Sequence, residues 1–215
     1  MDKSLLIAHL KMNYIFYLSI IISSLIIAII SNSFIIEILF SYIVISFLGY
    51  VTHLVSHENL VEKYYRNFRK KCRIKKKSFL NKIIMGIIDV LNFHNITHHD
   101  TSINKHILNI LFEAIHNMCS QSLGPIILIY LTKCINLHVI FLWGIMYATV
   151  HNINYVLFPS KTHEKHHINE RTNYGIDVYD ILNETKYDNT LENINHYAIN
   201  IIIITLTYSL YMTSF

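Results

Sequence analysis

Residues 13–30, with the sequence NYIFYLSIIISSLIIAII, contain no Asp, Glu, Lys or Arg. At about 1.5 Å of rise per residue, a helix of this length reaches about 27 Å, which is close to the thickness of the hydrocarbon core of a bilayer. A second apolar run, residues 34–52, follows a short polar break and carries one acid, Glu37, near its start, where a carboxylate reaches the interface at little cost. Both runs are therefore predicted to be membrane-spanning helices that form a hairpin.

Further apolar segments predict a polytopic membrane protein. Residues 114–131 and 137–152 form a second hairpin around a short polar turn, and residues 197–213 are a possible further span. The hydrophobic fraction of 53% agrees with this interpretation. Residues 13–30 are expected to remain as an anchor, because the run is too long for a signal peptide and has no small-residue cleavage site. The expected fold is all-α, a single membrane domain over residues 1–215 with about four transmembrane helices in two hairpins.

A basic segment sets the predicted orientation of these helices. Nine Lys and Arg residues lie between Lys63 and Lys77 with no acid among them. The positive-inside rule places residues 53–110 in the cytosol, and the N-terminus with them. A nucleic-acid-binding arm is the rival interpretation, but membrane helices flank the segment, so we expect no nucleic-acid partner. The same charges can attract anionic lipid or an acidic electron-donor protein.

Histidine is the unusual component of the composition. The chain has 14 His, as many as Asp and Glu together, whereas its three cysteines are widely spaced and show no CxxC pattern. We interpret the cysteines as reduced thiols without a role in metal binding. The predicted helices bring nine histidines to one membrane face, where they form a cytosolic helical cap: His53, His57, His94, His98, His99, His151, His163, His166 and His167.

The spacing of these histidines predicts a metal centre. Within the groups they recur at i, i+3 or i+4, which places imidazoles on one face of a helix, except that His99 points roughly 100° away from His94 and His98. Several imidazoles in one pocket would repel each other on protonation unless metal ions keep them neutral and bound. Imidazole ligation suits iron, zinc, copper or nickel, and nine rings exceed what one ion can use, so two ions are favoured. The remaining isolated histidines are interpreted as ordinary core or surface residues: His9, His106, His138 and His196.

The segment THEKHH, residues 162–167, has two interpretations. As His163-Glu164-x-x-His167 it is a zinc metalloprotease helix with Glu164 as general base. As His163-x-x-His166-His167 it is one of several histidine boxes, and Glu164 is incidental. The protease would leave the other histidines without a role. A non-catalytic metal-binding membrane protein is the third possibility.

The ordered motifs HLVSH, HNITHH, YATVHNINY and HEKHH followed by NYGIDVYDIL resemble the fatty acid hydroxylase and sterol desaturase superfamily over residues 40–187. This resemblance implies that the nine histidines bind two iron ions, with zinc possible in a purified form. It also implies hydroxylation or desaturation of an aliphatic C–H bond of a fatty acyl chain, sphingolipid or sterol with O2. Electrons would come from a separate b-type cytochrome and its reductase on the cytosolic side. The implied location is the endoplasmic reticulum membrane in a eukaryote, or the inner membrane in a bacterium.

The chain departs from the family pattern at two places. Tyr155 stands where well-known members have a further histidine, so water can replace one ligand. Tyr179-Asp180 and Asn183-Glu184-Thr185 stand where the family has Trp-Asp and Phe-Gly-Thr. Asp180 and Thr185 are thus retained, and the Phe-Gly pair is not.

Several residues are candidates for orienting the metal ligands rather than binding metal. Glu113 and His116 have an ExxH spacing, and their alternative role is an ordinary buried polar pair. Asp177 and Asp180 are further candidates, and their alternative role is capping a turn at Asn173-Tyr174-Gly175, in which Gly175 provides the backbone freedom. The full set of candidates is Glu113, His116, Tyr155, Asp177 and Asp180.

Overall fold

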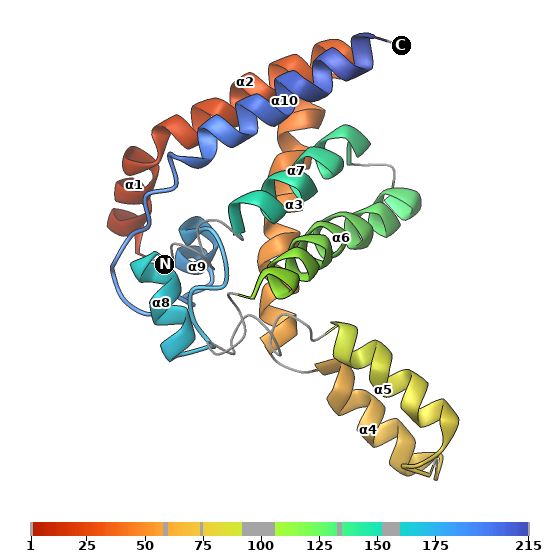
Figure 1. Cartoon of the computed structure of the whole chain (residues 1–215). Helices are drawn as coiled ribbons and strands as arrows, with labels where there is room; N and C mark the ends of the chain where they lie inside the picture. The colour runs from red at the N-terminus through yellow and green to blue at the C-terminus, as the bar shows by residue number, and fades with distance from the viewer. Residues whose placement is uncertain are drawn as a thin grey trace.

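The computed structural model describes residues 2–57, 60–73, 75–91, 106–132, 135–151 and 160–214. Within these ranges every regular element is an α-helix, as predicted (Figure 1). The helices are α1 Lys3–Met12, α2 Tyr14–Ser31, α3 Ile35–His57, α4 Leu60–Lys71, α5 Phe79–Leu91, α6 Ile107–Thr132, α7 Leu137–His151, α8 Lys161–Ile168, α9 Asp177–Leu182 and α10 Tyr197–Thr213.

Two helices, α2 and α3, are long and apolar enough to cross a membrane. Only 28% and 33% of the residues in their apolar windows are buried, so most of these side chains are partly or fully exposed. A core helix of a soluble protein would be mostly buried, and the outward apolar faces therefore indicate membrane association. Among the described residues, the other apolar helical stretches have 10–17 residues: Ile107–Cys119, Leu137–Val150 and Tyr197–Thr213. The four-span arrangement in two hairpins stays a prediction, as does the single domain over residues 1–215.

Four helices supply the main hydrophobic core. Figure 1 shows α2 and α10 side by side over most of their length, whereas α3 runs across them. The main partner of α2 is therefore α10, from the far end of the chain, and α6 packs mainly on α7. The core lies where α2, α3, α7 and α10 meet, and it includes Ile27, Ile45, Val139 and Ile201.

Hydroxyl groups join three of these helices within the apolar region. Ser23 of α2 hydrogen bonds to the Tyr42 hydroxyl of α3 over 2.6 Å and to the Thr205 hydroxyl of α10 over 2.7 Å. Small residues such as serine allow close helix approach in membranes, and each such bond contributes about 1 kcal/mol. This contact links α3 to the α2–α10 pair.

A joint between α1 and α2 is held by the segment that precedes α10. Asn13, fully buried between the two helices, donates to the Glu192 carbonyl over 2.9 Å and accepts from the Ile194 backbone N–H over 2.8 Å. Asn195 makes a hydrogen bond in the opposite sense, from the segment before α10 to the joint: its amide donates to the Met12 carbonyl over 2.7 Å. Backbone groups freed at the joint thus find partners, and α10 starts beside α2.

Helices α4 and α5 pack together apart from the other helices in Figure 1. The basic segment, residues 63–77, runs from α4 into the connection to α5. Most of its cationic side chains are exposed. Large apolar side chains are exposed on the same two helices, among them Tyr64, Phe68, Phe79 and Ile87. The pair is therefore amphipathic, with cations and apolar groups both open to the surroundings.

We predict that Asn13→Ala lowers the free energy of unfolding by about 2 to 4 kcal/mol, because it leaves the Glu192 carbonyl and the Ile194 N–H buried without this partner. The control is Asn67→Ala on α4, which removes an exposed amide and should change stability by less than about 0.5 kcal/mol. Unfolding in detergent, followed by circular dichroism, compares the two. Equal stabilities would contradict the role given to the joint.

Candidate metal centre

The last turns of α3 bring two predicted ligands together. His53 and His57 are one helical turn apart, with ring centroids separated by 4.9 Å. His53 is buried, and His57 is the final residue of the helix. An i, i+4 pair on one face can offer both imidazoles to one ion.

A second helix, α8, carries the segment THEKHH. It begins after Ser160, whose hydroxyl accepts a hydrogen bond from the His163 backbone N–H over 3.2 Å. This cap starts the helix immediately before the histidines. His163 and His166 are buried, whereas Glu164 is exposed.

Three imidazoles from the two helices form a group that can hold a metal ion. The ligand atoms of His53, His57 and His166 all lie within 4.8 Å of one another. The ring centroid of His166 is 4.8 Å from that of His53 and 4.7 Å from that of His57. The Tyr174 ring covers all three, with centroid separations of 5.8 to 5.9 Å. Three buried nitrogen donors suit a transition metal.

The outer nitrogens of two rings in this group are bound to backbone carbonyls. His53 Nδ1 lies 2.5 Å from the Tyr174 carbonyl oxygen, and His166 Nδ1 lies 2.6 Å from the Thr172 carbonyl oxygen. A carbonyl can only accept, so Nδ1 of each ring carries the proton and Nε2 carries the lone pair. This is the arrangement that orients histidine ligands in metalloproteins.

The third ring, His57, has a carboxylate on its outer side. Its Nδ1 lies 3.8 Å from the Glu170 carboxylate, and its Nε2 lies 3.1 Å from Nε2 of His166. Because Nε2 of His166 carries a lone pair, a hydrogen bond between the two Nε2 atoms needs the proton on Nε2 of His57. Nδ1 of a neutral His57 would then carry a lone pair, which would face the negatively charged Glu170 carboxylate. A shared metal ion removes this conflict.

A second imidazole pair has the same geometry. Nε2 of His167 lies 2.9 Å from Nε2 of His163, and the His163 ring centroid is 5.7 Å from that of His166. Two nitrogens bound to one ion at about 2.0–2.1 Å, with ordinary coordination angles, are separated by about 3.0–3.4 Å. Both Nε2–Nε2 distances are close to this separation, so each pair is suited to chelate an ion.

The loop after α8 is held in place by Asp180. Its carboxylate accepts from the backbone N–H of Tyr174 over 2.9 Å, from that of Gly175 over 3.1 Å, and from the Thr185 hydroxyl over 2.7 Å. Burial raises the pKa of Asp180 to about 7, and these three bonds oppose a further rise. The carbonyl of the same Tyr174 accepts from His53, so Asp180 positions the His53 ring through the backbone of one residue.

The left-handed residue of this loop is Asn173, with φ of 54°, whereas Gly175 has no positive φ. A Cβ on Gly175 would lie 3.4 Å from the Tyr50 Cβ. This is ordinary van der Waals contact with α3, and the backbone freedom expected of Gly175 is provided by Asn173.

Asp177, the other aspartate candidate, belongs to a different network. It contacts His9 Nδ1 at 3.6 Å, accepts from Lys186 over 2.5 Å and accepts from the Glu192 backbone N–H over 2.7 Å. Burial would raise the pKa of Asp177, but the interactions with His9, Lys186 and Glu192 outweigh it and hold the pKa below its usual value. These contacts tie α1 to the segment before α10, and His9 is a buried structural histidine as expected.

The other predicted site residues are placed only in part. His94, His98, His99 and Tyr155 lie outside the described residues, and so does the side chain of His151, which ends α7. Glu113 is fully buried and His116 partly buried on α6. The ligand roles of these four histidines, and the orienting roles of Tyr155, Glu113 and His116, stay predictions.

Comparison with known proteins gives no assignment. No family model, no curated protein and no solved structure matches this chain.

Sequence reasoning did not identify the groups that orient the rings. The carbonyls of Thr172 and Tyr174 are backbone atoms, which no residue pattern reveals. Glu170 follows the last histidine of THEKHH by three residues, and an acid just after a histidine box was the available signal.

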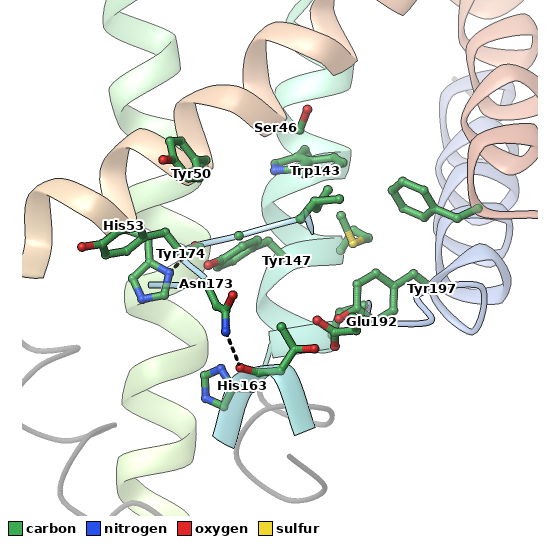
Figure 2. A pocket seen from close by; sticks show the side chains of 17 residues that line it. Ser46, Tyr50, His53, Trp143, Tyr147, His163, Asn173, Tyr174, Glu192 and Tyr197 are labelled. Carbon is green, nitrogen blue, oxygen red and sulfur yellow. Dashed lines mark hydrogen bonds between the residues drawn. The ribbon is translucent and has the colours of Figure 1, made fainter. Parts of the chain in front are cut away.

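A cavity adjoins His53 and His163 and extends between the helices of the core. Figure 2 shows His53 and His163 on one side, Trp143 and Tyr147 above, and Glu192 and Tyr197 opposite. Its volume is about 50 Å³. Aliphatic and aromatic side chains from α2, α3, α7 and α10 form much of its wall. An apolar ligand can therefore lie against the rings.

We predict that His166→Ala and His57→Ala each lower affinity for Zn²⁺ or Fe²⁺ more than about tenfold, because loss of even an orienting partner costs that much. His106→Ala, which removes an exposed histidine at the start of α6, is the control and should retain the metal. Elemental analysis and chelator competition on purified protein measure the difference. Wild-type affinity in both site variants would refute the metal centre.

Asp180→Asn should lower the free energy of unfolding by about 1 to 3 kcal/mol, because an amide cannot accept all three hydrogen bonds. It should also weaken metal binding about tenfold or more, by releasing the carbonyl that orients His53. Asp188→Asn, at an exposed pair with Lys165, is the matched control. Unchanged metal affinity in a destabilised Asp180→Asn protein would limit Asp180 to a structural role.

Proposed function

We propose that this protein is a membrane-bound metal-dependent oxygenase of the fatty acid hydroxylase and sterol desaturase type. The observation that carries the proposal is the convergence of His53, His57 and His166, from two helices more than one hundred residues apart in sequence. A second pair, His163 and His167, lies beside them with the same spacing of Nε2 atoms. Two adjacent sets of imidazoles support a centre of two ions, for which we propose iron.

The proposed reaction is balanced as follows: an aliphatic C–H bond, O2, two electrons and two protons give an alcohol and water. Desaturation consumes the same reductant and O2 but removes two hydrogens and forms two waters. Bound iron ions would supply activation of O2, a chemistry that imidazole ligation supports. Electrons require a separate donor, for which we propose a b-type cytochrome with its reductase.

The residues of the chain have defined tasks in this proposal. The carbonyls of Tyr174 and Thr172 hold Nδ1 protons, so that the Nε2 atoms of His53 and His166 remain basic. The Tyr174 ring covers the imidazoles and excludes water from one side. The apolar cavity lets an aliphatic chain approach His53 and His163.

The arrangement relative to the bilayer supports a lipid substrate. The ligands lie at the end of α3, one of the two candidate spans, and the adjoining cavity is built from apolar helices. We propose that the site faces the cytosol, on the same side as the basic α4–α5 pair, where an acidic donor protein can dock. In a eukaryotic host the corresponding membrane is the endoplasmic reticulum.

The protease interpretation receives less support from the same geometry. Glu164, its general base, is exposed while His163 and His166 are buried. A protease helix would use His163 and His167 and would have no use for the group of His53, His57 and His166.

The test is lipid analysis of a host that expresses the chain, its His166→Ala variant or its Glu164→Gln variant. We expect one lipid class to gain an oxygen atom or to lose two hydrogen atoms with the wild type and Glu164→Gln, and not with His166→Ala. Growth under ¹⁸O2 should label a hydroxylated product. Loss of a proteolytic activity in Glu164→Gln, with no lipid change in any strain, would instead favour the protease. Bound metal without oxygen uptake would favour a non-catalytic protein.

A further inference from the structure

The cavity beside the histidines contains two buried polar groups that the chain does not fully satisfy. Trp143 and Glu192 are only 4% and 8% exposed. Within the described structure, the indole N–H of Trp143 and the Oε1 atom of Glu192 have no hydrogen-bond partner. Both residues line the cavity that His53 and His163 also line (Figure 2).

Glu192 is held in this position by its own backbone. Its N–H donates to Asp177 over 2.7 Å, and its carbonyl accepts from Asn13 over 2.9 Å. Both backbone groups are bound to other elements, so the backbone of Glu192 is held beside the cavity, which its side chain lines. Burial raises the pKa of Glu192 to about 7, and the charge of Asp177 adds to this effect, whereas Ser160 opposes it.

An unsatisfied buried polar atom destabilises a protein, and an apolar side chain at the same position would avoid this cost. Here one donor and one acceptor share the same largely apolar cavity. Buried polar groups that await a partner in such a pocket are the usual means of ligand orientation and discrimination. The small volume of the cavity, about 50 Å³, favours a narrow unbranched chain over a fused ring system.

We propose that this cavity binds an unbranched aliphatic ligand that carries a hydroxyl group, and that Glu192 determines specificity by accepting the hydrogen bond of that hydroxyl. The role of this ligand as the substrate rests on the proposed oxygenase function, but its binding does not. The hydroxyl orients the chain, and its methylene groups lie along the apolar wall toward His53 and His163. Trp143 offers its N–H to an oxygen atom of the same ligand.

Trp143 is the single tryptophan of the chain, so its fluorescence reports directly on the cavity. The full chain in lipid nanodiscs is titrated with dodecan-1-ol and, separately, with the isomeric ether 1-methoxyundecane, which cannot donate a hydrogen bond. We expect the alcohol to saturate the change in Trp143 emission at about one-tenth of the mole fraction that the ether requires, because one net hydrogen bond separates them.

Glu192→Leu should abolish this preference, whereas Glu192→Gln, which retains an acceptor, should keep most of it. Glu164→Leu makes the same change at an exposed glutamate and should leave the preference intact. Circular dichroism checks the fold of each variant. Should Glu192→Leu not fold, Glu192→Met, with a longer flexible apolar side chain, tests the same loss.

Equal binding of alcohol and ether by the wild type, or a preference that survives in the folded Glu192→Leu or Glu192→Met protein, overturns the assignment. If neither probe changes the emission, the cavity holds ordered water alone, and the assignment is again overturned. Metal is not required for this measurement. If the protein has oxygenase activity but fails the fluorescence test, only the binding proposal is wrong. If it passes the fluorescence test but has no oxygenase activity, only the proposed function is wrong.

Discussion

Two hydrogen bonds to backbone carbonyls are the constraint on which the proposed centre depends. A neutral imidazole can carry its proton on either nitrogen and its ring can flip, unless a hydrogen bond selects one tautomer and one orientation. The carbonyls of Thr172 and Tyr174 make this assignment for His166 and His53, and they leave the Nε2 lone pairs directed at a common space. Because the carbonyls belong to one short loop, the two orientations are coupled. The conformation of this loop therefore determines how the rings of the proposed centre are oriented.

This loop is in turn held by interactions that reach the membrane helices. Asp180 binds the backbone of Tyr174 and Gly175, and Thr185 connects Asp180 to the Tyr50 hydroxyl on α3 over 3.0 Å. The helix that carries His53 and His57 therefore also supports the loop that orients them. Thr185 donates directly to Asp180, so the two residues hold the loop together as one unit.

The segment before α10 has a similar double role at the other side of the cavity. Its backbone fills the hydrogen-bonding needs of the α1–α2 joint through Asn13 and Asn195, and one of its side chains, Glu192, enters the cavity. The backbone hydrogen bonds of this segment fix its position, and Glu192 lies buried beside the proposed metal centre. The pairing of α2 with α10 follows, because α10 begins at the end of this segment.

The sequence by itself was sufficient to predict an all-helical chain, the positions of α2 and α3, and the helical faces of the His53/His57 and THEKHH groups. Each of these depends on local periodicity and on apolar length, which are properties of neighbouring residues. Only the tertiary structure decided that His57 and His166, 109 positions apart, face each other. It also decided which groups lie at the outer nitrogens of the three rings: the Thr172 carbonyl at His166, the Tyr174 carbonyl at His53 and the Glu170 carboxylate at His57. Local patterns could not decide this, because backbone carbonyls carry no sequence signal and the approach of distant segments depends on packing. Packing of distant segments also explains why Trp143 and Glu192 line the same cavity, because α7 and the segment before α10 both form its wall.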